Sequence, residues 1–218
     1  IPIRTDIGRE IRKAFVAPEG HQLITADYSQ IELRILAHLS DDPALIEAFH
    51  AGEDIHQAVA AQINEVPLDQ VTSEQRSGAK MVNFGIVYGV TPWGLARRLN
   101  IGNNEAAEII DNYKARFANI TSFLDECVHF AREHGYVKTM LGRRRPIRDI
   151  DDRNPQRKAL AERMAINSVV QGSAADLIKL AMIDLHELIR EAKLDEPLEG
   201  TKMILQIHDE LVFETPYD

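Results

Sequence analysis

Apolar residues recur at helical spacing through the middle of the chain, whereas short extended apolar runs stand near its two ends. The extended runs predict a strand at 23–27 and a strand pair at 201–207 and 211–215 around a polar turn. The pattern between them predicts helices at 29–39, 43–52, 54–63, 72–88, 92 onwards, 104–117 and 121–134. Most of the chain is therefore expected to be helical, with the strands near its ends.

Capping signals sharpen two of these helix starts. Ser29 is followed three residues later by Glu32, and Thr72 by Gln75, which is the capping-box pattern. The first pattern places Asp27 at a junction between a strand and a helix. The second opens a helix that ends near Gly89.

The last third of the chain combines a hairpin with one long helix. Gly135 ends the helix before it, and the runs 136–140 and 144–147 flank a polar tip and predict two paired strands. Asn154 and a following proline open a helical region that runs to about Ala192. Gly172 and Ser173 interrupt this region only mildly.

Composition is that of a globular protein. With 218 residues, of which 44% are hydrophobic, the chain can bury a sizeable core. No apolar run approaches the roughly 18 residues of a membrane span, and the N-terminus has no apolar signal core, so we expect no membrane association and a cytoplasmic location. Cys127 is the only cysteine, which excludes an internal disulfide; its place in a helical pattern predicts a buried or half-buried thiol.

The charge is unevenly distributed. A net charge of −9 argues weakly against nucleic-acid binding. One stretch nevertheless has nine cations against four acids and has the charge to follow a phosphate backbone: Lys138, Arg143, Arg144, Arg145, Arg148, Arg153, Arg157, Lys158 and Arg163 against Asp149, Asp151, Asp152 and Glu162. The alternative for the arginine triplet is a solvated loop tip.

Asp27 and Asp209 are the most informative candidate site residues. Each lies between an extended apolar run and a polar tip, and each has a neighbouring acid, Glu32 and Glu210 respectively. Two carboxylates and one backbone carbonyl are enough protein ligands for divalent ions that also bind substrate phosphates. Taken singly, an aspartate at the end of a strand is usually a turn or cap residue, and it is the combination with the neighbouring acids that favours metal ligands.

Arg76, Lys80, Phe84 and Tyr88 follow one another at steps of four residues. Each step turns the helix by about 40°, so the four form one slowly turning stripe with cations at one end and aromatic rings at the other. Such a stripe suits a triphosphate and a base; the alternative is an amphipathic helix with a solvated cationic end. Taken alone, His56 predicts only an ordinary surface or core histidine.

Three ordered segments resemble the motifs of the family A DNA polymerases, the bacterial DNA polymerase I type. Asp27–Arg34 resembles motif A, and His208-Asp209-Glu210 resembles motif C. Motif B is matched by Arg76, Lys80, Phe84-Gly85 and Tyr88-Gly89, and the resemblance continues through Glu162-Arg163, Asn167 and Gln171-Gly172. It covers essentially the whole chain.

The resemblance implies an α+β fold, with an antiparallel palm sheet and mostly helical fingers. It assigns 1–40 to the palm with motif A and 41–134 to the fingers with motif B. Residues 135–218 become the second palm part, with the basic hairpin, the long helix and motif C. A thumb, a proofreading exonuclease and a 5′-nuclease domain are not matched, so the resemblance implies a core fragment.

The same resemblance implies a two-magnesium phosphoryl transfer. Asp27 and Asp209 would bind both ions, with the Tyr28 carbonyl as a further ligand and Glu210 as an auxiliary acid. Lys80 would also protonate the departing pyrophosphate. The residues implied to bind the deoxynucleoside triphosphate are Gln30, Glu32, His56, Arg76, Lys80, Phe84 and Tyr88.

Within that set, Glu32 would pack against Tyr88 and exclude a ribose 2′-hydroxyl. Phe84 would stack near the incoming sugar and base. Contacts to primer-template DNA are implied for Gly89, Arg163, Asn167, Gln171 and His208, mainly in the minor groove, where correct pairs share acceptors.

The leading hypothesis is therefore a DNA-directed DNA polymerase core that acts as a monomer. A catalytically silent fragment that binds nucleotide or DNA is the alternative, because without a thumb we expect the chain to bind duplex DNA weakly. A relative of the single-subunit RNA polymerases is a third possibility. Glu32 argues against it, since an RNA-synthesising enzyme must admit the 2′-hydroxyl.

Overall fold

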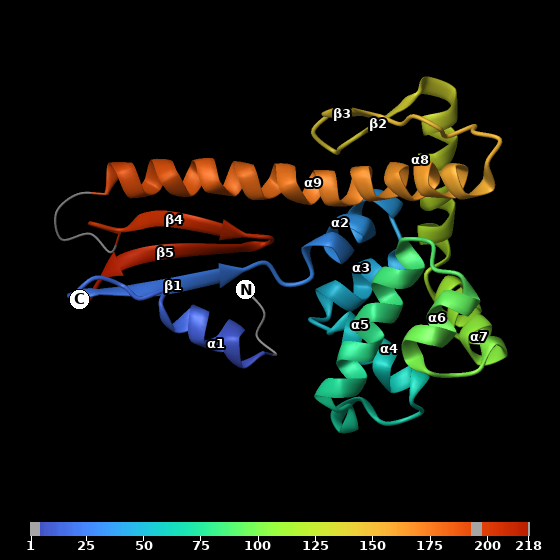
Figure 1. Cartoon of the computed structure of the whole chain (residues 1–218), viewed down its shortest axis with the longest axis horizontal. Coiled ribbons are helices and arrows are strands. Elements are labelled where there is room, and N and C mark those ends of the chain that lie inside the picture. Colours follow the sequence, from blue (N-terminus) through green and yellow to red (C-terminus); the bar gives the residue numbers. More distant parts are fainter. Residues whose placement is uncertain (1–4, 193–197, 218) are drawn as a thin grey trace. The chain divides into compact units, whose positions relative to one another are not determined.

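The computed structural model describes residues 5–192 and 198–217, in two compact units (Figure 1). One unit takes in the chain up to Ile31 together with the chain from Ala175 onwards. The other unit spans Glu32–Ala174. The long helix α9 (Pro155–Glu191) contributes residues to both.

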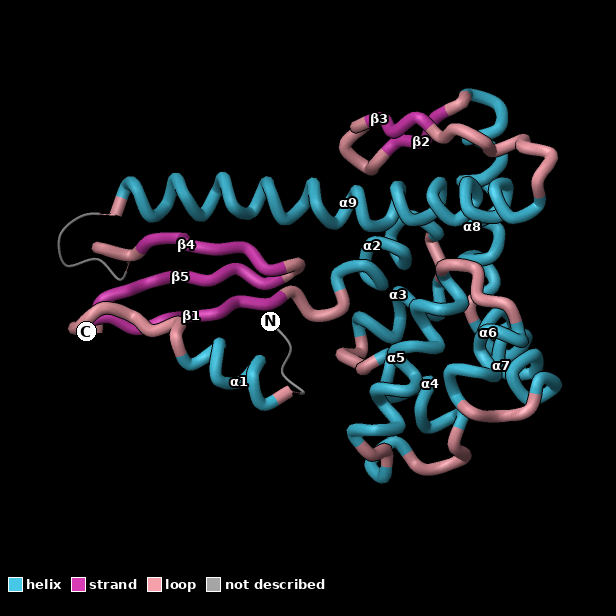
Figure 2. Tube along the Cα trace, in the orientation of Figure 1, coloured by secondary structure: helices cyan, strands magenta, loops and turns pink. Residues whose placement is uncertain are grey.

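The first unit is built on a three-stranded antiparallel sheet in the order β1-β5-β4 (Figure 2). Its strands are β1 (His21–Asp27), β4 (Lys202–Ile207) and β5 (Glu210–Pro216), so the strands predicted at both ends are confirmed. The central strand β5 buries Leu211 and Val212. The register places Asp27 and Ile207 on either side of Glu210. Two segments far apart in sequence thus share one sheet.

The same unit contains a helix that the apolar pattern did not predict, α1 (Asp6–Lys13). Thr5 caps it, because its hydroxyl accepts a hydrogen bond from the backbone N–H of Gly8 at 3.1 Å. Ile7 and Ile11 are exposed on it. Without a buried stripe, only the cap and the acid-to-base charge order along the helix pointed to it.

The second unit contains most of the helices, and their capping residues are largely those expected. They are α2 (Ile31–Ser40), α3 (Pro43–His50), α4 (Ile55–Ile63), α5 (Ser73–Val87), α6 (Pro92–Leu99), α7 (Asn103–Arg116) and α8 (Ala118–His134), with a short 3-10 turn at Leu68–Gln70. Asp42, Asp54, Thr72 and Thr91 accept hydrogen bonds from backbone N–H groups in the first turns. The Thr72 capping box is confirmed on both sides.

Two helix starts differ from the sequence prediction. The helix after Asp27 begins at Ile31, two residues beyond Ser29, because Gln30 has a left-handed backbone with φ 56°. The eighth helix begins at Ala118 rather than 121, because Phe117 ends α7 and starts α8 while it is 1% exposed in the core. Burial of the Phe117 ring therefore sets where α7 ends and α8 begins. No capping side chain marks this junction in the sequence.

The β2–β3 hairpin, β2 (Tyr136–Lys138) and β3 (Arg144–Pro146), packs with α8 and the first half of α9. Val137, Ile147 and Ala165 belong to their shared core. Gly172 lies under the hairpin, since a Cβ added there would stand 2.7 Å from Thr139 Cγ2. This glycine, which the pattern treated as a mild interruption, permits the close approach.

The architecture is therefore mixed, mainly helical with small antiparallel sheets. The division at residues 40 and 134 and the palm and fingers labels remain predictions.

Candidate functional site

Asp27 and Asp209 come from segments that are hydrogen bonded to each other. Asp27 ends β1, and Asp209 lies in the turn between β4 and β5. The backbone N–H of Tyr28 donates to the Asp209 carbonyl at 3.2 Å. His208 gives the turn its left-handed residue, with φ 57°, and its carbonyl accepts from the Gln206 amide at 2.9 Å. The structure thus brings five of the predicted site residues, 27, 28, 208, 209 and 210, to one end of the sheet.

The chemistry of these donors fits a hard divalent cation. Aspartate carboxylates and a backbone carbonyl supply only oxygen, which magnesium prefers, and magnesium usually keeps several waters or phosphates as further ligands. Across residues 5–192 and 198–217 there is no group of three or more His, Cys, Asp or Glu side chains able to hold a metal. Two carboxylates and a carbonyl would therefore need substrate oxygens to complete the coordination.

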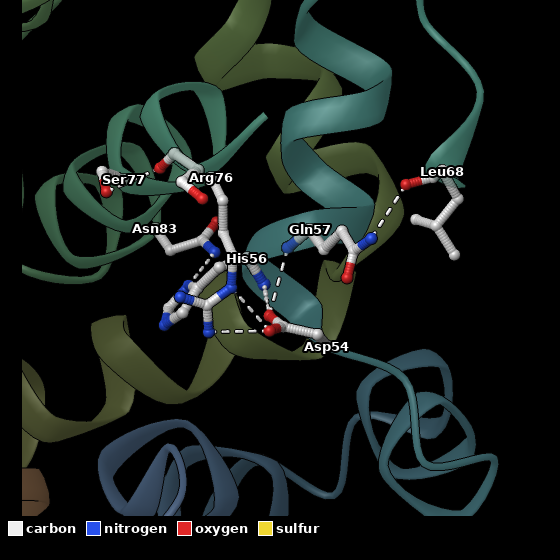
Figure 3. Close-up of polar contacts among 8 residues, drawn as sticks. Asp54, His56, Gln57, Leu68, Arg76, Ser77 and Asn83 are labelled. Carbon is white, nitrogen blue, oxygen red and sulfur yellow. Dashed lines mark hydrogen bonds and ion pairs between the residues drawn. The ribbon is translucent and has the colours of Figure 1, made fainter. Parts of the chain in front are cut away.

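In the second unit, Arg76 is held by an acid that the sequence assigned only to a helix cap. Its Nε and Nη2 both lie 2.7 Å from Asp54 Oδ2 (Figure 3). Asp54 Oδ1 meanwhile accepts from the backbone N–H groups of His56, at 2.9 Å, and Gln57, at 3.1 Å. Burial raises the pKa of Asp54, but the hydrogen bonds from Arg76 and Gln57 outweigh it and hold that pKa below its ordinary value. One carboxylate thus caps α4 and orients a cation on α5.

His56 is a buried residue, 2% exposed, rather than a surface one. Its Nδ1 lies 2.8 Å from the Asn83 side-chain nitrogen, which marks Nδ1 as the acceptor (Figure 3). Burial lowers the pKa of His56 to about 4, although the charge of Asp54 opposes the shift. The ring is therefore neutral at pH 7 and has its Nε2–H left to donate.

The aromatic end of the stripe forms a stack that Glu32 closes. The rings of His56 and Phe84 lie 5.7 Å apart, and those of Phe84 and Tyr88 are stacked at 6.1 Å. The Tyr88 hydroxyl donates to Glu32 Oε2, and the Gln171 amide lies 3.5 Å from Glu32 Oε1. Burial, reinforced by Glu32, raises the pKa of Tyr88 far above its ordinary value, so the hydroxyl keeps its proton.

Lys80 lies between the two ends of the stripe. Its side chain is exposed, and Nζ stands 5.9 Å from the centre of the Phe84 ring. Arg76, Lys80, Phe84 and Tyr88 thus lie in sequence along one face of α5 and its C-cap, as the spacing predicts. Cations line one end of that face, and a hydrogen-bonded aromatic stack forms the other.

Two surface depressions contain the predicted DNA contacts of this unit. Gly89 and Arg163 line one depression with His129 and Arg132. Asn167 and Gln171 line the other, together with Arg143, Arg145 and Gly172. Asn167 Oδ1 is buried and has no hydrogen-bond partner among the described residues, so the second depression contains an unused acceptor. His208 and Glu210 belong to the other unit, as does Gln30.

Comparisons with known proteins agree with the motifs. The model of DNA polymerase family A matches residues 1–218. The chain belongs to that family. This family A chain is 50% identical to DNA polymerase I of Caldicellulosiruptor bescii over 218 residues, 100% of this chain and 25% of that protein. It is 51% identical to DNA polymerase I of Geobacillus stearothermophilus over 217 residues, 99% of this chain and 24% of that protein.

A solved structure matches as well. The POL domain of Pol1 from M. smegmatis, in complex with DNA primer-template and dNTP, aligns with a TM-score of 0.90 and 48% identity. The match covers 99% of this chain and 37% of that chain. The family A chain thus spans about a quarter of the length of the curated relatives given above.

Two residues that contact candidate site residues are not apparent from the sequence. The sequence indicates only a helix cap for Asp54 and no role for Asn83, whereas in the structure Asp54 also holds Arg76 and the Asn83 amide is hydrogen bonded to the His56 ring. Asn83 is 0% exposed inside a helix, where asparagine is an unfavourable residue. That mismatch between residue type and buried position was the available signal. Over the part of the chain that is described, no helix combines the length and apolarity needed to cross a membrane.

Proposed function

We propose that this family A chain is the core of a DNA-directed DNA polymerase that adds deoxynucleotides to a primer 3′ end. The observation that carries the proposal is the face of α5, where Arg76 and Lys80 precede Phe84 and Tyr88, and Tyr88 donates to Glu32. A triphosphate, a sugar and a base follow one another in the same order. The whole-chain family match and the DNA-bound relative support the proposal.

Asp27, Asp209 and the Tyr28 carbonyl would hold two magnesium ions. Bound there, the ions would lower the pKa of the primer 3′-hydroxyl and neutralise charge that develops at the α-phosphate. The protein's part is to keep the two carboxylates on hydrogen-bonded segments, which the Tyr28-to-Asp209 bond supports. Glu210 takes the role of an auxiliary acid.

The triphosphate would be held by donors of different charge. Arg76 is preorganised by Asp54, and Lys80 is exposed and free to reach a phosphate oxygen or to give a proton to departing pyrophosphate. His56 contributes a neutral Nε2–H donor, because its pKa of about 4 leaves it uncharged at pH 7. A neutral donor adds a hydrogen bond without adding charge.

Sugar selection would depend on Glu32 and Tyr88. Their hydrogen bond keeps the Glu32 carboxyl against the ring edge, where it would meet a ribose 2′-hydroxyl. Phe84 would stack near the incoming sugar and base, and Gln30 would line the nucleotide site. Replacing Glu32 with Ala should admit ribonucleotides; unchanged discrimination would refute this assignment.

Primer-template DNA would contact both units. Arg163, Asn167 and Gln171 would reach the minor groove from the second unit, and His208 from the first. Gly89 would place the templating base. The unpaired Asn167 Oδ1 supports a polar ligand at this depression.

The deciding experiment is extension of a labelled primer-template by the 218-residue chain with magnesium and all four deoxynucleotides. Asp209→Asn is the control, because it keeps the side-chain shape and removes one metal-binding charge. Extension that disappears in the control supports a self-sufficient polymerase core. Magnesium-dependent nucleotide binding without extension supports the alternative, a catalytically silent binding fragment.

The role of Lys80 has its own test. Lys80→Ala should slow the chemical step far more than it weakens DNA binding, because its proposed partner is the triphosphate. Losses of equal size in the two measurements would contradict that role.

A further inference from the structure

An aromatic and cationic surface at the end of α8 and on the β2–β3 hairpin contains none of the residues proposed for the polymerase site, although two of its cations belong to the basic stretch 138–163. It consists of Phe130, His134, Tyr136, Lys138 and Arg144, which we call the hairpin platform. Phe130 and His134 are stacked with ring centres 4.1 Å apart, and Tyr136 meets both rings edge-on, at 5.7 and 6.0 Å. The three rings form one contiguous group, in which His134 is exposed and Phe130 and Tyr136 are half-buried.

Two exposed cations lie over these rings. Lys138 Nζ is 5.7 Å from the centre of Phe130 and 5.8 Å from that of Tyr136, and the Arg144 guanidinium is 4.8 Å from Tyr136. Contact with a ring face orders a cation while leaving its other donors in water. Neither Lys138 nor Arg144 is ion-paired with any described carboxylate. The platform's histidine lies close to an acid, since Glu133 Oε2 is 3.9 Å from His134 Nδ1.

The hairpin register brings these like charges together. Lys138 pairs directly with Arg144 across the two strands, so both side chains project from the same face as Tyr136. Like charges directly opposite each other destabilise an antiparallel pair. An anion bound between them would remove that repulsion. Val137 and Arg145 project from the opposite face, where Val137 is buried in the core.

The platform is not required to attach the hairpin. Other contacts already do so: the Met140 N–H donates to Ser173 Oγ at 2.9 Å, and the Ile147 N–H donates to the Gly135 carbonyl at 2.9 Å. Val137, 1% exposed, adds apolar contact with α8 and α9. The hairpin is therefore attached by contacts that do not involve the platform cations, which are exposed.

We infer that the hairpin platform binds the phosphodiester backbone of a DNA strand, beyond the contacts assigned to the polymerase site. Two exposed cations supply positive charge for phosphates, and the aromatic rings beside them are of the kind on which bases stack. This inference rests on the proposed function only in taking DNA as the ligand. Either a single strand or a duplex supplies the same chemistry.

The test compares two double variants that lose the same charge. Lys138→Gln with Arg144→Gln removes the platform cations, and Lys114→Gln with Lys179→Gln removes two exposed cations elsewhere. Fluorescence anisotropy of a labelled single strand and a labelled duplex is measured without nucleotide or metal, from about 50 to about 300 mM salt. The slope of log affinity against log salt counts the lost phosphate contacts.

For the platform variant, we expect the slope to become shallower by about 1.4 for a single strand or about 1.8 for a duplex. Affinity at about 0.1 M salt should fall roughly tenfold or more. The control should change both values by less than half as much. Which probe loses affinity identifies the form of DNA bound.

The inference would be overturned if the slope and the affinity changed equally in the two double variants or changed in neither. It would also be overturned if the unsubstituted chain showed no salt-dependent binding. If the platform variant does not fold, Arg144→Gln alone carries the test, with half the expected change in slope. Primer extension is measured separately on the unsubstituted chain. Its absence would contradict the proposed polymerase function and leave the slopes, and hence the platform, untouched.

Discussion

Replacing Gly172 with Ala offers a sharp test of how the hairpin meets α9. In an exposed helix interior this change would stabilise the protein by about 1 kcal/mol, because alanine has the better helix propensity. Here the new Cβ would stand 2.7 Å from Thr139 Cγ2, a distance that forces the hairpin to shift. Overpacking of that kind costs about 1–3 kcal/mol.

A shift would also strain two hydrogen bonds that cross the same contact. Arg143 Nη2 donates to the Gly172 carbonyl at 3.0 Å, and the Met140 N–H donates to Ser173 Oγ at 2.9 Å. Loss of one such bond costs about 1 kcal/mol. These two costs together exceed the gain in helix propensity, so Gly172→Ala should lower the free energy of unfolding by about 1–3 kcal/mol.

Thr139→Ser provides the matched background, because it deletes only the methyl that the new Cβ meets. The serine keeps the hydroxyl that accepts from the Arg143 N–H at 3.1 Å. The next atom facing the Cβ is Arg143 Nη2 at 3.5 Å, an ordinary contact. In this background Gly172→Ala should become stabilising by up to about 1 kcal/mol, so its effect changes sign.

The assay is urea unfolding of the four members of this double-mutant cycle, followed by circular dichroism and by the fluorescence of Trp93, the only tryptophan. Trp93 belongs to the same compact unit as the hairpin, and coincidence of the two transitions justifies two-state analysis. Equal destabilisation by Gly172→Ala in the threonine and serine backgrounds would refute the close contact.

Three further predictions concern single side chains. Asp54→Asn keeps a good helix cap but removes the ion pair with Arg76. The free energy of unfolding should change by less than about 1 kcal/mol. The affinity for magnesium-nucleotide, measured by calorimetry, should fall about tenfold. Unchanged affinity would show that Asp54 does not preorganise Arg76. The pKa of His56 is 6.5 in the unfolded chain and about 4 in the folded chain, so the native state binds fewer protons. The stabilisation that follows from this difference is fully present above pH 6.5 and declines as the pH falls towards 4. In urea unfolding, the free energy of unfolding should fall by about 2 kcal/mol between pH 6.5 and about 5, and His56→Gln should abolish this fall. An identical fall in the variant would show that other groups cause it. Cys127 is buried and its pKa is raised to about 12, so it should react with a thiol reagent at pH 8 only in urea; rapid labelling of the folded chain would contradict its burial.

Most elements were predictable because their signals are local. Proline and capping residues mark the starts of α3, α5 and α6, and the strand pair around Asp209 follows from two extended apolar runs separated by a polar turn. The stripe on α5 follows from helix geometry alone, since residues four apart share a face. The whole-chain family match likewise depends only on the order and spacing of residues.

Contacts between distant segments could not be read in the same way. Nothing in the sequence pairs Asp54 with Arg76, or Asn83 with His56, because each pair joins different helices. The neutral state of His56 follows from burial, and burial depends on packing. Local signals in the sequence are enough to place most helices and strands and the chemical groups that they present, because propensity, capping and periodicity act over a few residues. Which of those groups are buried, oriented and paired depends on the packing of the folded chain, because desolvation and hydrogen bonding involve neighbours that are close in space and remote along the chain.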